Sequence, residues 1–469
     1  MAHLLLFDLP GGNDFGVVDD AVALGHRLTL LTADAGHYQR LGDPAWHRIQ
    51  RVIEVRPWTP TRLRDAAAAI HHEDPFEALL CLIDIRIVDA SVLAQDLGLP
   101  FLSPAAARLL RDKAAVRSAL RAHGIPQPPF AEVGGAAGLR AAVADLGLPL
   151  IVKPADGYGS QDVTLLRSAG EVDRTCAALE AAGDGATDYG FGVRASRRLL
   201  VERYVEGAMV GCDLFVRGTR RVFLGVNAKE RFAPPSFAFR GSCFPSRRHD
   251  VAMLERHANR LLDAVGFDFG ACHIEMILGP EGPVLVEINP RLVSAQIPFQ
   301  MGYAFGRSIY AELIGLQRGE PLDDLAALRP QAFSTIRWLV ADTEGILEGI
   351  DLPADETPAV QRVVLLRRPV TRSARHGTTA TASAMSSPPP PARTTPMPPP
   401  KPIWLRPGSG SEPLPRSWQP MPARRRFRVG CNFRSLDPPT PTCPACRAST
   451  PFSTNSAACK PMHRASISA

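Results

Sequence analysis

The 469-residue sequence has no unbroken apolar run of the length that a membrane span requires. Its first residues, Met1 to Pro10, are apolar but have neither the basic leader nor the cleavage pattern of a secretion signal. Cysteine is scarce as well, because the chain has nine, of which five lie widely spaced within residues 1–370. We therefore predict a cytoplasmic protein with reduced cysteines and no membrane partner.

The body of the chain also lacks the basic excess that nucleic-acid binding requires. The net charge is +6, but the residues from Thr371 onward carry 14 Lys and Arg against two acidic residues. Residues 1–370 carry 39 Lys and Arg against 45 Asp and Glu, so this part is mildly acidic. The basic run Arg424–Arg428 has no regularly spaced aromatic residues beside it, so we interpret it as solvated charge and predict no nucleic-acid partner.

Hydrophobic periodicity predicts a parallel α/β layer in the first hundred residues, where short apolar runs alternate with helical patterns. This layer has no GxxxxGK and no complete GxGxxG, so its glycines are interpreted as turn residues. The expected strands of the whole chain are His3–Phe7, Arg27–Thr32, Ala78–Asp84, Leu148–Lys153, Leu199–Val205, Cys212–Arg217, Arg221–Val226, Ala271–Leu278, Pro283–Ile288, Ala332–Val340 and Val360–Leu366. The expected helices are Asn13–Gly25, Ile87–Gly98, Ala105–His123 and Ile309–Gly319.

The pattern stops after about Pro369. Twenty of the 99 residues from Thr371 onward are proline, including the run Pro388–Pro391, and no apolar period continues. Too little apolar surface can be buried there to offset chain entropy, so we predict a disordered tail. Both a shifted reading frame and a natural linker would explain the abrupt change.

A strand that ends in a lysine and a glycine-rich turn is the first stretch with chemical content. Lys153 closes this strand, and Gly157, Gly159 and Ser160 follow in the turn. Glycines allow backbone N–H groups to approach phosphate oxygens while the lysine supplies charge. A solvent-facing lysine before a hairpin turn is the competing interpretation.

The apolar strand Leu199–Val205 is the second stretch. Such a strand can present backbone N–H and C=O groups to an adenine edge, and its valines can form an apolar wall for the ring. An ordinary amphipathic strand would look the same, so the interpretation depends on its position between Lys153 and the acidic pair described next.

Two apolar strands joined by Gly279-Pro-Glu-Gly282 form the third stretch and predict a β-hairpin. Alternation places Glu275 on one strand, and Glu287 and Asn289 on one face of the other. Oxygen ligands from neighbouring strands suit magnesium. Arg291 lies just beyond them and could stabilise charge that develops on a phosphoryl group or a tetrahedral intermediate.

Lys113 lies on the predicted helix before Gly124-Ile125-Pro126 and is the fourth element. It could bind an α- or β-phosphate, and alone it would be a surface lysine. The order of these four elements resembles the ATP-grasp superfamily, over roughly residues 1–370. Within it, the segment Asn289–Ile297 followed by Tyr303–Leu316 is most similar to the branch of L-amino acid ligases and dipeptide synthetases.

The resemblance implies an ATP-dependent carboxylate–amine ligase that forms an amide or peptide bond through an acyl phosphate and releases ADP and phosphate. It implies ATP and Mg²⁺ as cofactors, with Mn²⁺ as an alternative, and small-molecule carboxylate and amine substrates such as amino acids. A homodimer is left open. The implied fold is mixed α/β and α+β: a Rossmann-like N-terminal domain (1–102), a lid-containing grasp region (103–200), a metal and catalytic region (201–330), a truncated C-terminal subdomain (331–369) and a disordered tail (370–469).

The resemblance also implies roles for individual residues. It assigns Lys153 and Arg291 to catalysis and Glu275, Glu287 and Asn289 to magnesium. Nucleotide contacts are assigned to Lys113, Lys153, Gly157, Gly159, Ser160, Glu202, Tyr204, Val205 and Asp213.

The sequence departs from the family at three places. Met209 stands where many relatives have a ribose-binding Glu, so Asp213 is the candidate substitute. Leu292–Ala295 replaces a diglycine and should narrow the pocket floor. Phe239 and Ser242 stand where the branch often has Glu and His, which suggests a substrate other than a plain pair of amino acids.

Other functions remain open at this point. An ATP-grasp carboxylase or a formate-activating enzyme of purine metabolism would share the same residues. A non-catalytic ATP-binding module would not need Arg291. The pair Cys443 and Cys446, with Cys431 and Cys459, could hold zinc, but the remaining spacings are irregular.

Overall fold

The computed structural model describes residues 1–9, 15–159, 161–182, 188–194, 196–232, 237, 239–338, 346–351, 362, 364, 426–430 and 465–468. The chain divides into two compact units, Met1–Ile336 and Arg337–Ala469. In the second unit, β17 (Ile346–Asp351) pairs in parallel with β18 (Arg426–Gly430), and β19 (Ala465–Ser468) is the last strand. Two short strands therefore lie in the segment expected to be disordered, and the rest of that segment is outside the described residues, as is most of the predicted strand 360–366.

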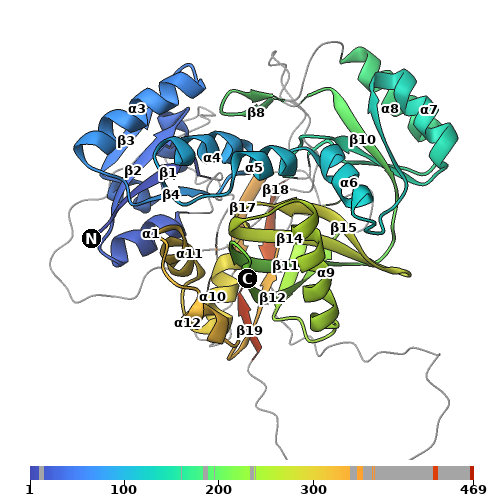
Figure 1. Cartoon of the computed structure of the whole chain (residues 1–469). Coiled ribbons are helices and arrows are strands. Elements are labelled where there is room, and N and C mark those ends of the chain that lie inside the picture. Colours follow the sequence, from blue (N-terminus) through green and yellow to red (C-terminus); the bar gives the residue numbers. More distant parts are fainter. Residues whose placement is uncertain are drawn as a thin grey trace, which may run out of the picture. The chain divides into compact units, whose positions relative to one another are not determined.

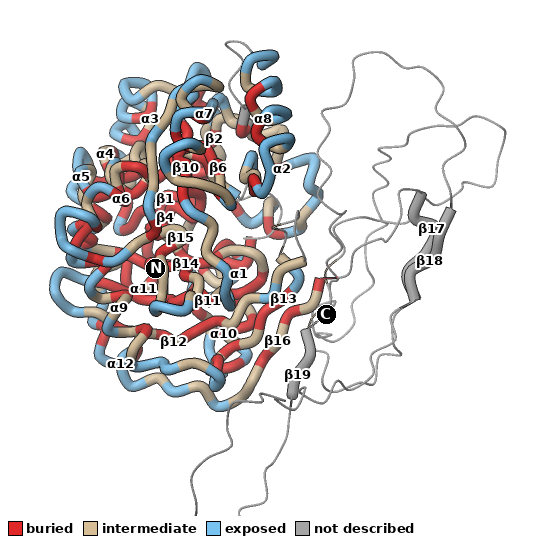
Figure 2. Tube along the Cα trace, turned by 90° about the vertical axis from the view of Figure 1, so that its right-hand side faces the viewer, coloured by how far each residue is buried: buried red, intermediate tan, exposed pale blue. Residues whose placement is uncertain are grey.

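The N-terminal layer is a parallel sheet in the order β3-β2-β1-β4, as the periodicity predicted. Every residue of β1 and β4 is buried, because helices cover the sheet (Figures 1 and 2). The strands are β1 (His3–Phe7), β2 (Arg27–Thr32), β3 (Arg51–Glu54) and β4 (Ala78–Cys81). The helices are α1 (Gly16–Ala23), α2 (Ala35–Leu41), η1 (Pro44–Arg48), α3 (Pro60–Glu73), η2 (Asp84–Arg86) and α4 (Ile87–Asp96).

The helix expected over residues 105–123 is instead two helices, α5 (Pro104–Leu110) and α6 (Lys113–Ala122). Asp112 interrupts them in an extended conformation, with φ −117° and ψ 101°. Its Oδ1 accepts the backbone N–H groups of Ala114 and Ala115, each at 3.0 Å, and so caps α6. This break makes Lys113 the first residue of α6.

The next layer is a four-stranded antiparallel sheet in the order β5-β10-β6-β7. Its apolar face packs against α7 and α8 through Leu139, Val152, Leu166, Cys176 and Val201. The strands are β5 (Phe130–Gly134), β6 (Leu150–Pro154), β7 (Thr164–Leu166) and β10 (Arg198–Arg203), the helices are α7 (Gly135–Leu146) and α8 (Ala169–Ala181), and a short hairpin is formed by β8 (Asp188–Gly190) and β9 (Val193–Arg194).

The largest sheet has the order β15-β14-β11-β12-β13-β16 within the first unit. Gly207 leads into it, and a Cβ atom there would lie 2.2 Å from the Leu278 carbonyl oxygen, so this approach requires glycine. The strands are β11 (Ala208–Arg217), β12 (Arg220–Arg231), β13 (Phe239–Phe244), β14 (Phe269–Gly279), β15 (Gly282–Asn289) and β16 (Phe333–Arg337). The helices are α9 (Val251–Ala264), α10 (Ile297–Phe305), α11 (Ile309–Gln317) and α12 (Asp323–Ala327).

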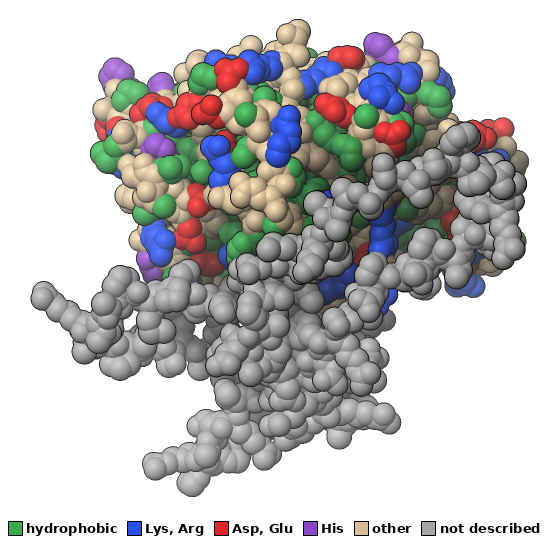
Figure 3. Space-filling model, turned by 90° about the horizontal axis from the view of Figure 1, so that it is seen from below, with side chains coloured by type: hydrophobic (Ala, Val, Ile, Leu, Met, Phe, Trp, Pro, Cys, Tyr) green, Lys and Arg blue, Asp and Glu red, His purple; other side chains and the backbone are tan. Residues whose placement is uncertain are grey.

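The surface shows mixed charge where the structure describes it. On the face in Figure 3, Lys and Arg side chains are interspersed with Asp and Glu. None of the helices in the described ranges combines the length and the apolar content that a bilayer span needs.

Candidate active site

Lys153 and Glu202 form a buried ion pair between neighbouring antiparallel strands. Lys153, on β6, places its Nζ 2.5 Å from Oε1 of Glu202 on β10, and each residue is 6% exposed. Arg117 from α6 donates to Glu202 Oε2 through Nε and an NH2 nitrogen, at 3.0 and 2.8 Å. The same guanidinium donates to the Leu285 carbonyl on β15 at 2.7 Å, so this network joins the two antiparallel sheets.

The shared carboxylate determines the charge state of this network. Burial by itself raises the pKa of Glu202, but the adjacent Arg117 and Lys153 outweigh burial and lower it to about 2. Burial lowers the pKa of Lys153, and Arg117 adds to that effect while Glu202 opposes it. Glu202 is thus the counter-ion of Lys153, a contact that its predicted role in nucleotide binding did not include.

Arg117 was missed by the sequence interpretation, although a signal was present. It lies four residues after Lys113, so both side chains share one face of α6. Val116 and Leu120 are buried on the same helix, and Arg117 is 2% exposed. An arginine on the buried side of a helix requires a buried acid, which was the detectable signal.

Lys113 connects the glycine-rich turn to the acidic hairpin. Its Nζ lies 2.7 Å from Glu287 Oε1 and donates to the Gly157 carbonyl at 2.5 Å. Gly157 is buried, with the Tyr189 hydroxyl 3.3 Å from the position of a Cβ atom, and Gly159 has a φ of +66°. Ser160 lies outside the described residues. The structure therefore brings together Lys113, the turn and Glu287, which are far apart in the sequence.

The acidic hairpin forms as predicted. β14 and β15 are antiparallel, and Glu275 pairs directly with Glu287 while His273 pairs with Asn289. Among the described residues, no group of three or more His, Cys, Asp and Glu side chains could hold a metal ion. The carboxylates of Glu287 and Glu275 are each ion-paired with a lysine, Lys113 and Lys229. Their role with Asn289 as oxygen ligands of magnesium stays a prediction.

Lys229, His273 and Asp213 form a buried row beside Glu275. Lys229 on β12 is ion-paired with Glu275, and its Nζ lies 2.7 Å from His273 Nε2. His273 Nδ1 lies 2.7 Å from Asp213 Oδ1, and both residues are 2% exposed. A Cβ atom on Gly211 would lie 2.5 Å from the His273 ring, so this glycine leaves space for the imidazole.

This row changes the interpretation of two residues. Burial by itself raises the pKa of Glu275. The adjacent Lys229 and His273 outweigh burial and hold that pKa well below its usual value. Lys229 was not among the predicted site residues, although a lysine near the end of a mostly apolar strand was a usable signal. Asp213 contacts His273 in the structure, and its role in ribose binding stays a prediction.

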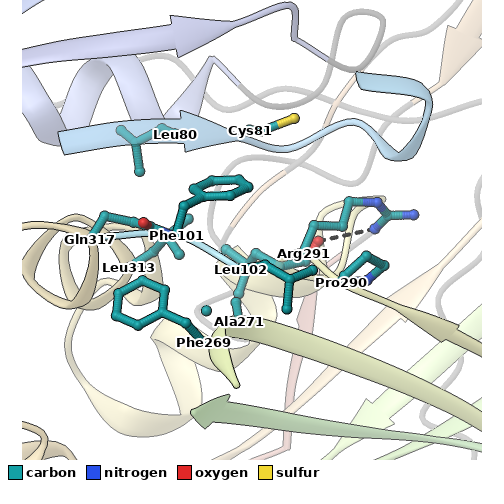
Figure 4. Close-up of a pocket in the computed structure, with 12 residues that line it drawn as sticks. Leu80, Cys81, Phe101, Leu102, Phe269, Ala271, Pro290, Arg291, Leu313 and Gln317 are labelled. Carbon is teal, nitrogen blue, oxygen red and sulfur yellow. Dashed lines mark hydrogen bonds between the residues drawn. The ribbon is translucent and has the colours of Figure 1, made fainter. Parts of the chain in front are cut away.

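Arg291 contacts the N-terminal layer. Its Nε donates to Asp84 Oδ2 at 2.7 Å, an NH2 nitrogen lies 2.5 Å from the same oxygen, and NH1 donates to the Leu292 carbonyl. Asn289 Oδ1 lies 3.5 Å from Arg291. Figure 4 shows a small pocket beside Arg291, whose guanidinium lies on the side away from Phe269 and Gln317.

The predicted adenine segment is partly exposed. The backbone N–H of Tyr204 donates to the Pro149 carbonyl at 3.0 Å, and the side chain of Val205 packs against Gly279. Both residues are of intermediate exposure. The structure thus locates this segment next to the acidic hairpin, and its role in adenine binding stays a prediction.

The predicted substrate loop needs one correction. Ser242 is completely buried and donates to Gln300 Oε1 at 2.7 Å, so its hydroxyl packs inside the protein. Phe239 is partly exposed and its ring lies 5.9 Å from Lys229 Nζ. Ala295, the last residue of the segment that replaces the diglycine, and the next residue, Gln296, have φ of 64° and 67°, a conformation that glycine adopts more readily.

Comparisons with known proteins agree with the fold described above. The family model of the ATP-grasp N-terminal domain matches residues 18–101, and that of the ATP-grasp domain matches residues 110–295, together more than half of the chain. The y4rH protein of Sinorhizobium fredii is 33% identical over 295 residues, which are 61% of this chain and 58% of that protein. Carnosine synthase 1 of Homo sapiens is 30% identical over 222 residues, 45% of this chain and 27% of that protein.

The chain thus spans less than two thirds of the curated relatives that it matches here. Among solved structures, the L-amino acid ligase of Bacillus licheniformis superposes with a TM-score of 0.59 at 17% identity, covering 74% of this chain and 82% of that one. That identity supports the fold alone. Because the family models cover both the N-terminal layer and the two antiparallel sheets that hold Lys153 and Glu287, the chain belongs to the ATP-grasp superfamily of ligases.

Proposed function

We propose that the chain is an ATP-dependent carboxylate–amine ligase that joins amino acids through an acyl phosphate. The observation that carries this proposal is the contact of Lys113 with both Gly157 and Glu287. It brings the lysine, the glycine-rich turn and the acidic hairpin to one place. Cations for phosphates and oxygen ligands for a metal are the two components that phosphoryl transfer requires.

In the proposed reaction, an oxygen of the substrate carboxylate attacks the γ-phosphorus of ATP and ADP leaves. The amine of a second substrate then attacks the acyl carbon, phosphate leaves, and the amine loses a proton. Bound Mg²⁺ would neutralise the phosphate charge, and Glu275, Glu287 and Asn289 are the residues that would hold it.

The chain's own residues supply positioning and positive charge. Lys113 and Lys153 would hold phosphate oxygens, and Glu202 and Arg117 fix Lys153 in place through the buried network. Arg291 would stabilise the negative charge that develops as the acyl carbon becomes tetrahedral. The protein forms no covalent bond in this reaction, so most of the rate enhancement comes from orienting the substrates and neutralising the phosphate charge.

Sequence relatives support amino acids as substrates. Carnosine synthase is named for a dipeptide product, and its similarity covers 45% of this chain. Biotin carboxylases share the fold, so the test compares amino acids with bicarbonate and formate.

The test is phosphate release from ATP by purified protein with Mg²⁺ and the twenty amino acids, singly and in pairs. Chromatography should find ADP and phosphate together with a new amide product. AMP and pyrophosphate would contradict the acyl-phosphate mechanism, and activity with bicarbonate or formate in place of amino acids would support a carboxylase or a formate-activating enzyme instead.

A further inference from the structure

Asp84 has a buried carboxylate oxygen that has no hydrogen-bond partner among the described residues. The residue follows β4 at the carboxyl edge of the N-terminal sheet and is 4% exposed. Its Oδ2 accepts a hydrogen bond from Arg291, whereas its Oδ1 has no donor in the part of the chain that the structure describes. A buried charged acceptor without a donor costs free energy, so it is rare in a native structure unless a water molecule, an ion or a ligand completes it.

Asp8 provides a comparison on the same edge of the sheet, since it follows β1. It is completely buried, its Oδ2 accepts Arg86 Nε at 2.8 Å, and its Oδ1 accepts the Tyr38 hydroxyl at 3.1 Å. Both oxygens of Asp8 are therefore satisfied within the protein. A carboxylate in this position can be fully paired, which makes the open Oδ1 of Asp84 a specific feature rather than a general property of the sheet edge.

The open oxygen lies close to the proposed reaction centre. Asp84 is joined to Arg291, which lies 3.5 Å from the proposed metal ligand Asn289. Tyr158 from the glycine-rich turn is near enough that the charge of Asp84, after burial, raises the pKa of its hydroxyl. A group bound to Asp84 Oδ1 would therefore lie beside Arg291, which has a role in the proposed reaction.

We propose that Asp84 Oδ1 accepts the ammonium group of the amino acid whose carboxylate is activated. This inference rests on the proposed ligase function and specifies its acyl donor as an amino acid with a free amine. The ion pair of Asp84 and Arg291 presents one negative and one positive group side by side, which matches the two charges of a zwitterion. An ammonium group also forms a charge-assisted hydrogen bond with a carboxylate oxygen, which is stronger than a hydrogen bond between neutral groups.

The magnitude follows from the burial of this oxygen. A site built to pair with a polar substrate group rejects analogues that lack it, because the buried partner is then left unsatisfied. We expect an amino acid to bind at least about 10²-fold more tightly than the matching carboxylic acid without the amine. In Asp84→Asn the charge is lost, and this preference should fall to less than about tenfold.

The experiment measures binding by isothermal titration calorimetry in the presence of Mg²⁺ and a non-hydrolysable ATP analogue. The twenty amino acids are each compared with the same acid lacking the amine, such as L-alanine with propionate and L-leucine with 4-methylpentanoate. Wild type, Asp84→Asn and Asp89→Asn are tested. Asp89 is a matched control. Its carboxylate accepts a hydrogen bond from the Trp58 indole, and Asp89→Asn removes one negative charge from the same domain as Asp84→Asn does.

Loss of the preference in Asp84→Asn, with the preference kept in Asp89→Asn, supports the inference. The inference is overturned if wild type binds the amino acids and the matching acids without the amine equally tightly. It is also overturned if Asp84→Asn weakens the binding of both sets by the same factor, because a purely structural ion pair would affect both sets alike. Absence of amino acid binding to wild type overturns it as well. If wild type discriminates between the ligand sets as expected but forms no ADP from ATP in the separate phosphate-release assay, the proposed ligase function alone is refuted.

Discussion

Replacing Glu202 with glutamine would leave two buried cations facing a neutral amide. Lys153 and Arg117 both pair with this carboxylate, at 2.5 and 2.8 Å, and neither is more than 6% exposed. Removing one partner of a buried ion pair leaves an uncompensated charge, which typically costs about 3–5 kcal/mol. The pKa of Glu202, lowered to about 2, indicates a similar magnitude of about 3 kcal/mol.

We therefore expect Glu202→Gln to lower the free energy of unfolding by about 3 kcal/mol at pH 7. Urea denaturation followed by circular dichroism measures this change. The matched control is Glu132→Gln, since Glu132 pairs with Arg198 at the surface, with side chains 42% and 46% exposed. That variant should lose less than about 1 kcal/mol.

The effect should depend on pH with a defined sign. The pKa of Glu202 is lowered on folding, so its stabilisation is fully present above about pH 4.5 and is lost as the pH falls toward about 2. The gap between wild type and Glu202→Gln should therefore shrink in acid, whereas it should stay constant above pH 5. A loss below about 0.5 kcal/mol at pH 7, or a loss equal to that of Glu132→Gln, would refute the argument that this network is a buried ion pair.

Three further predictions follow from the site and from the tail. Glu287→Gln and Asn289→Ala should each lower the rate of ADP formation by about 10³-fold or more, while the circular dichroism spectrum and the thermal midpoint stay near those of wild type. Near-normal rates with Mg²⁺ would contradict the metal assignment. Phe239→Glu should place a carboxylate near Lys229 and shift the amino acid profile in the phosphate-release assay, while an unchanged profile would exclude this ring from the substrate site. Limited proteolysis should leave a product that ends near residue 370, and a chain that ends there should keep the activity of the full chain. A protease-resistant tail, or a loss of activity on truncation, would show that the tail packs on the body.

The sequence alone identified the elements whose signals are local. The β14–β15 hairpin was predicted from alternating apolar residues around Gly279 and Gly282, and the structure pairs Glu275 with Glu287 across it. His3–Phe7 and Arg27–Thr32 were predicted with their observed bounds because a buried parallel strand is a short apolar run between turn residues. Near-neighbour patterns are sufficient where both partners of a contact lie in one short segment.

Contacts between distant segments were decided by the tertiary structure. The side chain of Glu202 is the counter-ion of Lys153 and Arg117, a contact that the sequence interpretation did not include, and Arg117 lies 85 residues away from it. Arg291 and Asp84 are 207 residues apart, so no periodicity could have joined them. These charged residues are buried, and a charge that is removed from water must be paired. The packing of the sheets and helices determines which partner each residue contacts.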